Sequence, residues 1–353
     1  MNRDPTDMMN FLAESYLYSL DPIAVKIYKG FNLHWYGLAY ITGFVMSWLI
    51  IRQMAKSDRS TLTTEGVWDL SFYSVLGVML GGRLGYAAFY DLGLFFGFEA
   101  TLPFWKLLAI HKGGMSSHGG IIGVIVAMWL YARRHKHSPL HILDLAAFSC
   151  LPGLFFGRLA NFNNGELWGR ALPADMQVNP PWWSVKYPQE LLTDSFRDSP
   201  EKIAQLRDSL GSIPGGQQIP MDELYSYIQN GNQEFIDLVQ PVLTAYYPSQ
   251  LFQAITDGPI LMIILALLWL RPRKPGVIGC SFLMAYGILR FATEFFRQPD
   301  EGVALLLGFS RGQVLSSLMI LSGAVILWLA VRRDVKPLGG LLKPAKTTPE
   351  HAS

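Results

Sequence analysis

Apolar stretches alternate with polar segments along most of the chain. Each stretch approaches the roughly 20 residues that an α-helix needs to cross the hydrocarbon core of a bilayer. They run near residues 34–51, 69–90, 115–132, 141–161, 249–270, 276–295 and 312–331. This pattern predicts an all-α polytopic membrane protein with about seven transmembrane helices.

Basic residues follow every second stretch, and they predict the direction of the helices. They are Arg52, Lys56 and Arg59 after the first stretch, Arg133, Arg134 and Lys136 after the third, Arg271, Arg273 and Lys274 after the fifth, and Arg332, Arg333 and Lys336 after the seventh. Short cytoplasmic loops carry an excess of lysine and arginine. We therefore expect the N-terminus outside and the C-terminus in the cytoplasm.

This orientation divides the chain into parts. Residues 1–33 form an extracytoplasmic N-terminal segment, and residues 34–336 form a seven-helix membrane domain. Within that domain, the polar segment 165–247 is long enough for an extracytoplasmic head. Residues 337–353 are expected to be a solvated cytoplasmic tail.

The composition supports a membrane protein and argues against a soluble domain or a nucleic-acid-binding protein. Half of the 353 residues are hydrophobic and 16% are charged, with a mean hydropathy of +0.24, whereas soluble domains carry roughly 25% charged residues. The formal net charge of +2 is too small to indicate a nucleic-acid partner. Cys150 and Cys280 lie in apolar stretches, without the spacing of metal ligands, so we expect them to pack.

Polar groups concentrate where the fourth stretch ends. Arg158, Asn161, Asn164 and Glu166 fall within Gly157–Arg170. Ionisable groups at membrane depth are costly and usually functional, and an arginine fork beside amides suits an anionic headgroup. A capped helix end with an arginine–glutamate pair is the structural alternative.

A second charged group lies in the outer half of the sixth stretch. Arg290 and Glu294 are four residues apart and share a helical face, and Arg297 follows one turn later. Arg290 is expected at a depth similar to that of Arg158, as in a phosphate clamp, and Arg83 in the second stretch is a further member. An internal salt bridge between Arg290 and Glu294 is the alternative.

Three more side chains are expected at the same outer level. His118, among glycines at the start of the third stretch, is either a proton-transfer group or a structural hydrogen-bonding residue. Tyr36 can face a cavity, although tyrosine and tryptophan at an interface are ordinary anchors. Gln250 is either part of a helix cap or part of the site. Their convergence predicts a polar, arginine-bearing pocket reached from the outer leaflet.

These residues closely resemble the signature of the bacterial phosphatidylglycerol–prolipoprotein diacylglyceryl transferase family, Gly-Arg-x-Gly-Asn-Phe-x-Asn-x-Glu-x-x-Gly. Here the motif reads Gly157-Arg158-Leu159-Ala160-Asn161-Phe162-Asn163-Asn164-Gly165-Glu166-Leu167-Trp168-Gly169. The family's His-Trp-Tyr-Gly, His-Gly-Gly, Pro-Ser-Gln-Leu and Tyr-Gly-x-x-Arg…Glu-Phe-x-Arg segments also match, in the same order along the chain. The resemblance runs from about Leu33 to Arg333.

The resemblance implies a multi-pass enzyme of the bacterial inner membrane that needs no metal or organic cofactor. It would transfer the sn-1,2-diacylglyceryl group of phosphatidylglycerol to the lipobox cysteine thiol of a prolipoprotein signal peptide. The products would be a thioether and glycerol phosphate. Phosphatidylglycerol, prolipoproteins and membrane lipids would be its partners, with no nucleic acid.

The resemblance and the chemistry together assign site residues. The catalytic candidates are His118, Arg158, Arg290 and Tyr36. The substrate-binding candidates are Arg158, Asn161, Asn164, Glu166, Gly169, Gln250, Glu294 and Arg297. The chain departs from the family pattern at Ala160, Asn163, Tyr247 and Gln253. A transporter or channel would carry polar residues along a complete path, and a non-catalytic lipid or signal-peptide receptor would be expected to have lost signature residues.

Overall fold

The computed structural model describes residues 15–28, 31–298 and 308–342. Contacts within the chain divide it into two compact units. Unit 1 comprises Met1–Gly43, Gly153–Ile260 and Gly287–Ser317, and unit 2 comprises Phe44–Pro152, Leu261–Tyr286 and Leu318–Ser353.

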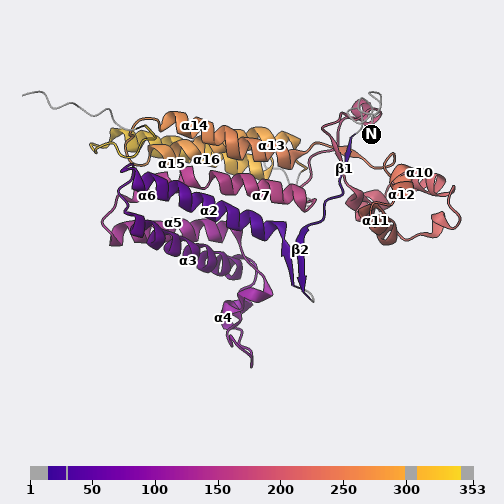
Figure 1. Cartoon of the computed structure of the whole chain (residues 1–353), viewed down its shortest axis with the longest axis horizontal. Coiled ribbons are helices and arrows are strands. Elements are labelled where there is room, and N and C mark those ends of the chain that lie inside the picture. Colours follow the sequence, from indigo (N-terminus) through magenta and orange to yellow (C-terminus); the bar gives the residue numbers. More distant parts are fainter. Residues whose placement is uncertain (1–14, 29–30, 299–307, 343–353) are drawn as a thin grey trace, which may run out of the picture. The chain divides into compact units, whose positions relative to one another are not determined.

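Every apolar stretch expected from the sequence is helical (Figure 1). The helices are α2 (Trp35–Lys56), α3 (Thr64–Phe89), α5 (Ser117–Arg134), α6 (Pro139–Ser149) with α7 (Leu151–Asn163), α13 (Ser249–Ile255) with η5 (Thr256–Ile260) and α14 (Leu261–Leu268), α15 (Val277–Thr293) with η6 (Glu294–Phe296), and α16 (Arg311–Arg332). Among the described residues, five segments are long and apolar enough to cross a membrane: Trp35–Lys56, Pro139–Asn163, Ser249–Leu268, Val277–Phe296 and Arg311–Arg332. The chain is therefore a mostly helical membrane protein.

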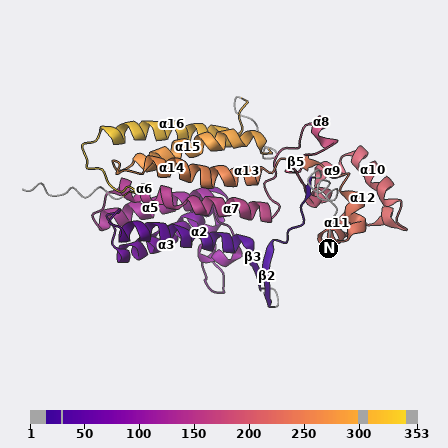
Figure 2. The ribbon, with the colours of Figure 1, turned by 45° about the horizontal axis from the view of Figure 1, so that its top comes forward.

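In unit 2, α3 and α5 lie side by side, as both views show (Figures 1 and 2). Glycines make this approach possible. A Cβ atom at Gly81 would lie 2.4 Å from the carbonyl oxygen of Gly119, and one at Gly123 would lie 2.0 Å from that of Gly77. Small residues let helix backbones approach closely in a membrane. The glycines at 119 and 123 therefore form a packing surface on α5.

A buried carboxylate joins two other segments of unit 2. Asp144 on α6 accepts hydrogen bonds from the backbone amides of Gly276 and Gly279, both at 2.7 Å. Those amides lie at the start of α15, where helical N–H groups lack acceptors. Asp144 is 2% exposed, so it caps α15 from inside the unit.

In unit 1, the segment between α7 and α13 forms a small helical head with its own core. The head contains α8 (Ala174–Gln177), η3 (Pro188–Leu192), α9 (Asp194–Arg197), α10 (Pro200–Leu210), η4 (Gly216–Gln218), α11 (Met221–Gln229) and α12 (Gln233–Val239). Figure 2 shows α10, α11 and α12 grouped together. The core is apolar and includes Leu191, Phe196, Leu206, Leu224 and Val239.

A buried ion pair holds this head together. Glu190 pairs with Lys202 at 2.5 Å, and it accepts bonds from the amide and hydroxyl of Thr244 at 2.9 and 2.6 Å. The Glu190 side chain is 3% exposed. Both carboxylate oxygens therefore have donors, as a buried charge requires.

Short strands accompany the helices and were not predicted. In unit 1, β1 (Tyr16–Leu17) pairs in parallel with β4 (Val185–Lys186), which pairs antiparallel with β5 (Ala245–Tyr246). A hairpin joins β2 (Ile23–Tyr28) to β3 (Phe31–His34). β1, β4 and β5 have two residues each, so they are too short to show the alternation of apolar and polar positions that marks a strand.

Unit 2 has three further short elements between α3 and α5. They are α4 (Gly93–Phe96), η1 (Lys106–Leu108) and η2 (Ile110–Lys112). The loop that contains η1 and η2 is anchored by Arg83, whose guanidinium donates to the carbonyls of Leu107, Gly113 and Lys106 at 2.8, 2.6 and 2.7 Å. Arg83 is 5% exposed, so it serves this loop in unit 2.

Candidate active site

An ion pair inside the helices of unit 1 fixes the first arginine of the predicted site. Arg158 lies on α7, and its Nε donates to Oδ2 of Asp257 at 3.0 Å. Asp257 lies in η5, where the wider helical turn of Thr256–Ile260 contains Pro259. The Asp257 side chain is fully buried, and that of Arg158 is 20% exposed. The buried carboxylate therefore holds a guanidinium that remains partly accessible.

A second ion pair lies in the same unit. Arg290 on α15 contacts Glu294 at 2.5 Å, and the two side chains are 11% and 8% exposed. Ser310 donates a hydrogen bond to the other oxygen of Glu294 at 2.9 Å. Arg290 is therefore held by a buried acidic partner of its own. Both predicted arginines of unit 1 thus lie in ion pairs with buried carboxylates.

A hydrogen-bonded network of polar side chains lies beside the first arginine. The amide of Asn161 donates to the hydroxyl of Tyr36, which donates to Glu166 at 3.1 Å. Asn164 donates to the second oxygen of Glu166 at 3.2 Å. Residues from α2, α7 and the following loop therefore meet as the sequence predicted.

Gln250 supports this network from α13. Its amide donates to the backbone carbonyl of Glu166 at 2.6 Å, and its oxygen lies 3.4 Å from the hydroxyl of Tyr187 in the head. Burial raises the pKa of Tyr187, so its hydroxyl stays protonated and donates. Gln250 is 1% exposed. It orients the loop that carries Glu166, and its two contacts account for its buried amide.

Gly169 brings three backbone segments together. A Cβ atom there would lie 2.1 Å from the carbonyl oxygen of Tyr247 and 2.8 Å from that of Phe296. Gly169 also forms a β-bridge with Arg297, and the guanidinium of Arg170 donates to the Arg297 carbonyl at 3.0 Å. These contacts tie the loop after α7 to the ends of β5 and η6.

His118 belongs to unit 2 and lies in the first turn of α5. The side chain of Ser116 caps that turn by accepting from the amide of Gly119 at 3.2 Å. The His118 side chain is exposed. The loop before it is the one that Arg83 anchors, so Arg83 supports the entrance to α5 through backbone carbonyls.

Asp257 was not predicted from the sequence. It lies in the middle of the fifth apolar stretch, outside any recognised motif. The signal was nevertheless present, because a carboxylate inside a membrane segment is costly and is usually retained for function or pairing. An aspartate there requires a cation, and Arg158 supplies it.

The arrangement suits an anionic ligand. Unit 1 holds two guanidinium groups inside its helices, and each has a buried acidic partner that fixes its orientation. Arginine binds phosphate through a planar array of donors. Within residues 15–28, 31–298 and 308–342 no group of three or more histidine, cysteine, aspartate or glutamate side chains is arranged to hold a metal ion.

Comparison with known proteins decides the family. The model of the prolipoprotein diacylglyceryl transferase family matches residues 22–329. The chain belongs to this family. The resemblance inferred from the spaced motifs is therefore confirmed.

Several relatives in the family cover nearly the whole chain. The phosphatidylglycerol–prolipoprotein diacylglyceryl transferase of Bdellovibrio bacteriovorus is 37% identical over 332 residues, which span 88% of this chain and 93% of the relative. The enzymes of the same name from Xylella fastidiosa and Oleidesulfovibrio alaskensis are 35% and 36% identical, and the matches cover 91% and 90% of this chain and 96% and 95% of the relatives.

Proposed function

We propose that this chain transfers the sn-1,2-diacylglyceryl group of phosphatidylglycerol to the lipobox cysteine of prolipoprotein signal peptides. The observation that carries the proposal is the presence of two buried arginine–carboxylate pairs, Arg158–Asp257 and Arg290–Glu294, inside the membrane helices of a member of this family. A phosphate-bearing headgroup is the ligand that this pair of arginines fits best.

The reaction forms one bond and breaks one. The cysteine sulfur attacks the diacylglyceryl carbon that carries the phosphate ester, so a carbon–sulfur bond forms and the carbon–oxygen bond breaks. The ester oxygen leaves with its electron pair as part of glycerol phosphate. The thiol proton passes to a base and then to solvent or to the leaving phosphate. Metal or organic cofactors have no part in this proposal.

Arg158 and Arg290 would support the leaving phosphate electrostatically. Such electrostatic interactions are strongest in a site that excludes water, because the local dielectric constant is lower there. Asp257 and Glu294 would act as positioning residues, since each holds one guanidinium in place. Tyr36, Asn161, Asn164 and Glu166 would orient the headgroup through their shared hydrogen bonds.

His118 is our candidate for the base that removes the thiol proton. A free cysteine thiol has a pKa of about 8.5, so a base near neutral pH increases the fraction of thiolate. The assignment rests on the imidazole and on its place in the His-Gly-Gly motif. Full transfer by His118→Ala at every pH tested would remove this role.

We also propose a topology of seven spans with the N-terminus outside. Five segments have the length and hydropathy of a membrane span. α3 and α5 would be the other two spans, because their glycines let each pack closely against the other. The basic loops then lie in the cytoplasm of a bacterium, with the protein in its inner membrane. Reporter domains fused after the head and after Arg333 should report opposite sides.

The test of the activity uses purified protein in detergent with phosphatidylglycerol and a peptide that carries a lipobox cysteine. Mass spectrometry should show a diacylglyceryl group on the peptide, and the matched Cys→Ser peptide should stay unmodified. Folded, lipid-bound protein that modifies neither peptide would contradict the proposal and favour a receptor or transporter.

A further inference from the structure

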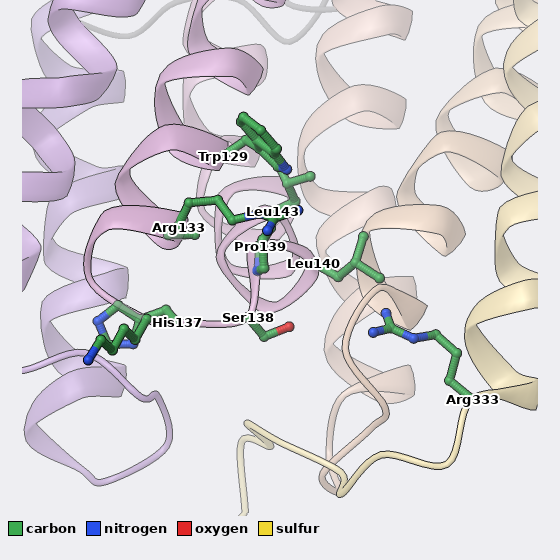
Figure 3. A pocket seen from close by; sticks show the side chains of 10 residues that line it. Trp129, Arg133, His137, Ser138, Pro139, Leu140, Leu143 and Arg333 are labelled. Atoms are coloured by element: carbon green, nitrogen blue, oxygen red, sulfur yellow. The ribbon is translucent and has the colours of Figure 1, made fainter.

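A cavity of about 460 Å³ lies in unit 2 at the basic end of α5 and α6, and no residue of the candidate active site lines it (Figure 3). Its charged lining comes from three cations: Arg133, Lys136 and Arg333. Cavities of roughly 300–1,000 Å³ are typical of small-ligand sites. The cavity therefore has the size of a small-ligand site and a cationic lining of its own.

The three cations have no acidic partner within the part of the chain that the structure describes. Each of the ion pairs found there involves other residues. The Arg133 guanidinium lies 5.0 Å from the ring centroid of Trp129, which also lines the cavity. Asp334, the neighbour of Arg333 in the sequence, is exposed and does not line it. The lining is therefore positively charged.

His137 does not add a fourth charge at neutral pH. Burial, with a smaller contribution from the nearby His135, lowers the pKa of His137. The neutral ring can still donate one hydrogen bond and accept another. His137 therefore contributes polarity to the cavity, and the three longer side chains contribute charge.

Lys136 occupies a backbone conformation that favours glycine. Its φ is +58°, and the turn closes α5 with bonds from the amide of His137 to Ala132 and from that of Lys136 to Arg133. Glycine is the usual residue at this position of a helix end, because other residues are strained there. A lysine at this position lowers stability relative to glycine, which suggests that its charge serves another purpose.

The chain also fixes the other cationic side of the cavity. Lys274 donates to the backbone carbonyls of Val331 and Arg333 at 2.8 and 2.7 Å, so the backbone at Arg333 is held just beyond α16. Arg133 and Arg333 project from two different elements towards the first turn of α6 (Figure 3). The two guanidinium groups therefore come from separate segments, α5 and the residues just after α16, and the backbone of each segment is held in place.

The rest of the wall is suited to a lipid. Trp129, Leu140 and Leu143 line the cavity beside the cations, and Trp129 is 44% exposed on the surface of α5. Tryptophan favours the level of the headgroups at a membrane surface. Ser138 and Pro139 begin α6 at the cavity, and the N-terminus of a helix favours an anion. Cations and an apolar wall next to each other match a phosphate group attached to a lipid.

We propose that this cavity binds the phosphate-bearing headgroup of an anionic membrane phospholipid, at a site separate from the transfer reaction. With the proposed topology, the lipid belongs to the cytoplasmic leaflet. The cations contact the phosphate, and Trp129 and the two leucines contact the glycerol and the start of the acyl chains. The bound lipid stabilises the junction of α5, α6 and the end of α16.

The test measures lipid retention on the purified full chain by native mass spectrometry in a neutral detergent. Cardiolipin is the anionic probe, and phosphatidylcholine is the zwitterionic control. Lys136→Gly and Arg333→Gln each remove one lining cation. Arg134→Gln is the matched control, because Arg134 is exposed at the end of α5, carries the same charge and does not line the cavity.

Each lining variant should bind cardiolipin about fivefold more weakly than the wild type, because about that factor is expected from the attraction between one basic residue and anionic lipid. Arg134→Gln should retain wild-type binding. Lys136→Gly should unfold at the same temperature as the wild type or higher, because glycine relieves the strained φ. That variant therefore separates loss of the ligand from loss of the fold. Transfer by Lys136→Gly, measured with phosphatidylglycerol, should persist.

Several results would overturn the proposal. Wild-type binding by Lys136→Gly would show that the cavity is not the site, and an equal loss in Arg134→Gln would show diffuse attraction to the basic loop. Equal retention of phosphatidylcholine would show no preference for charge. Displacement of cardiolipin by inorganic phosphate or glycerol 3-phosphate would assign the cavity to a soluble phosphate instead.

Discussion

Replacement of Asp257 by asparagine tests whether the buried carboxylate positions Arg158. The change keeps the shape of the side chain and removes its charge. In the wild type, Asp257 is fully buried and lies 3.0 Å from the Arg158 guanidinium. The substituted amide would accept one hydrogen bond without fixing the cation, and it would leave buried positive charge without a balancing negative charge.

Two effects are expected from Asp257→Asn, and they have different sizes. Loss of a partner for a buried charged group lowers the free energy of unfolding by about 1–3 kcal/mol, less than for a fully buried pair because Arg158 is 20% exposed. A group that orients a catalytic residue commonly contributes about 10–100-fold to activity. We therefore expect kcat for transfer to fall by about that factor per folded molecule.

The assay follows thioether formation on a lipobox peptide, normalised to the folded fraction. Asp144→Asn is the matched control, because Asp144 is also a buried aspartate but caps α15 in unit 2. That variant should lose stability and keep its activity per folded molecule. Asp257→Glu should recover part of the rate, since it restores the charge.

If Asp257 acts by positioning Arg158, the effects of substitutions at the two residues should not add. Arg158→Gln combined with Asp257→Asn should cost much less than the sum of the single changes, because both act on one guanidinium. Activity of Asp257→Asn within about twofold of the wild type would refute the reasoning. So would a loss of the same size in Asp144→Asn.

Three other changes test the surroundings of the site. Gly169→Ala should lower the free energy of unfolding by about 2–3 kcal/mol, because its Cβ would lie 2.1 Å from the Tyr247 carbonyl; thermal unfolding measures this. Glu190→Gln should loosen the head by about 1–3 kcal/mol through loss of its buried ion pair and hydrogen bonds, seen as faster proteolysis of residues 188–244. Arg83→Gln should speed amide hydrogen exchange across residues 106–114, whose carbonyls the guanidinium binds.

The first two of these changes have a matched control. Gly157→Ala should be tolerated, since a Cβ atom there has nothing within 4 Å, and equal loss in both glycine variants would contradict the close-approach argument. Glu201→Gln alters an exposed glutamate of the same head, so it should leave proteolysis unchanged. Unchanged exchange in Arg83→Gln would show that the loop is held by other contacts.

The sequence predicted the helices well because their signal is strong and local. Long apolar stretches bounded by basic loops leave few alternatives. The contacts among Tyr36, Asn161 and Glu166 were also predicted, because polar groups at the same depth in a membrane are costly unless they pair with one another. The arginine at 290 pairs with Glu294, as the spacing of four residues indicated.

Other features depend on contacts between distant segments and were not predicted. Asp257 pairs with a residue 99 positions away, and its own neighbourhood in the sequence does not identify the partner. Arg83 was expected to join the phosphate clamp, yet its guanidinium binds the backbone of the loop before His118. The strands β4 and β5 of the head are two residues long, too short to show an alternation of apolar and polar positions.

The most direct test of the central claim measures both products of one reaction mixture. Wild-type protein with phosphatidylglycerol and the lipobox peptide should form thioether and glycerol phosphate in equal amounts, and Arg158→Gln and Arg290→Gln should lose both while they stay folded. Release of glycerol phosphate without the thiol peptide, or full product formation by both arginine variants, would contradict the account.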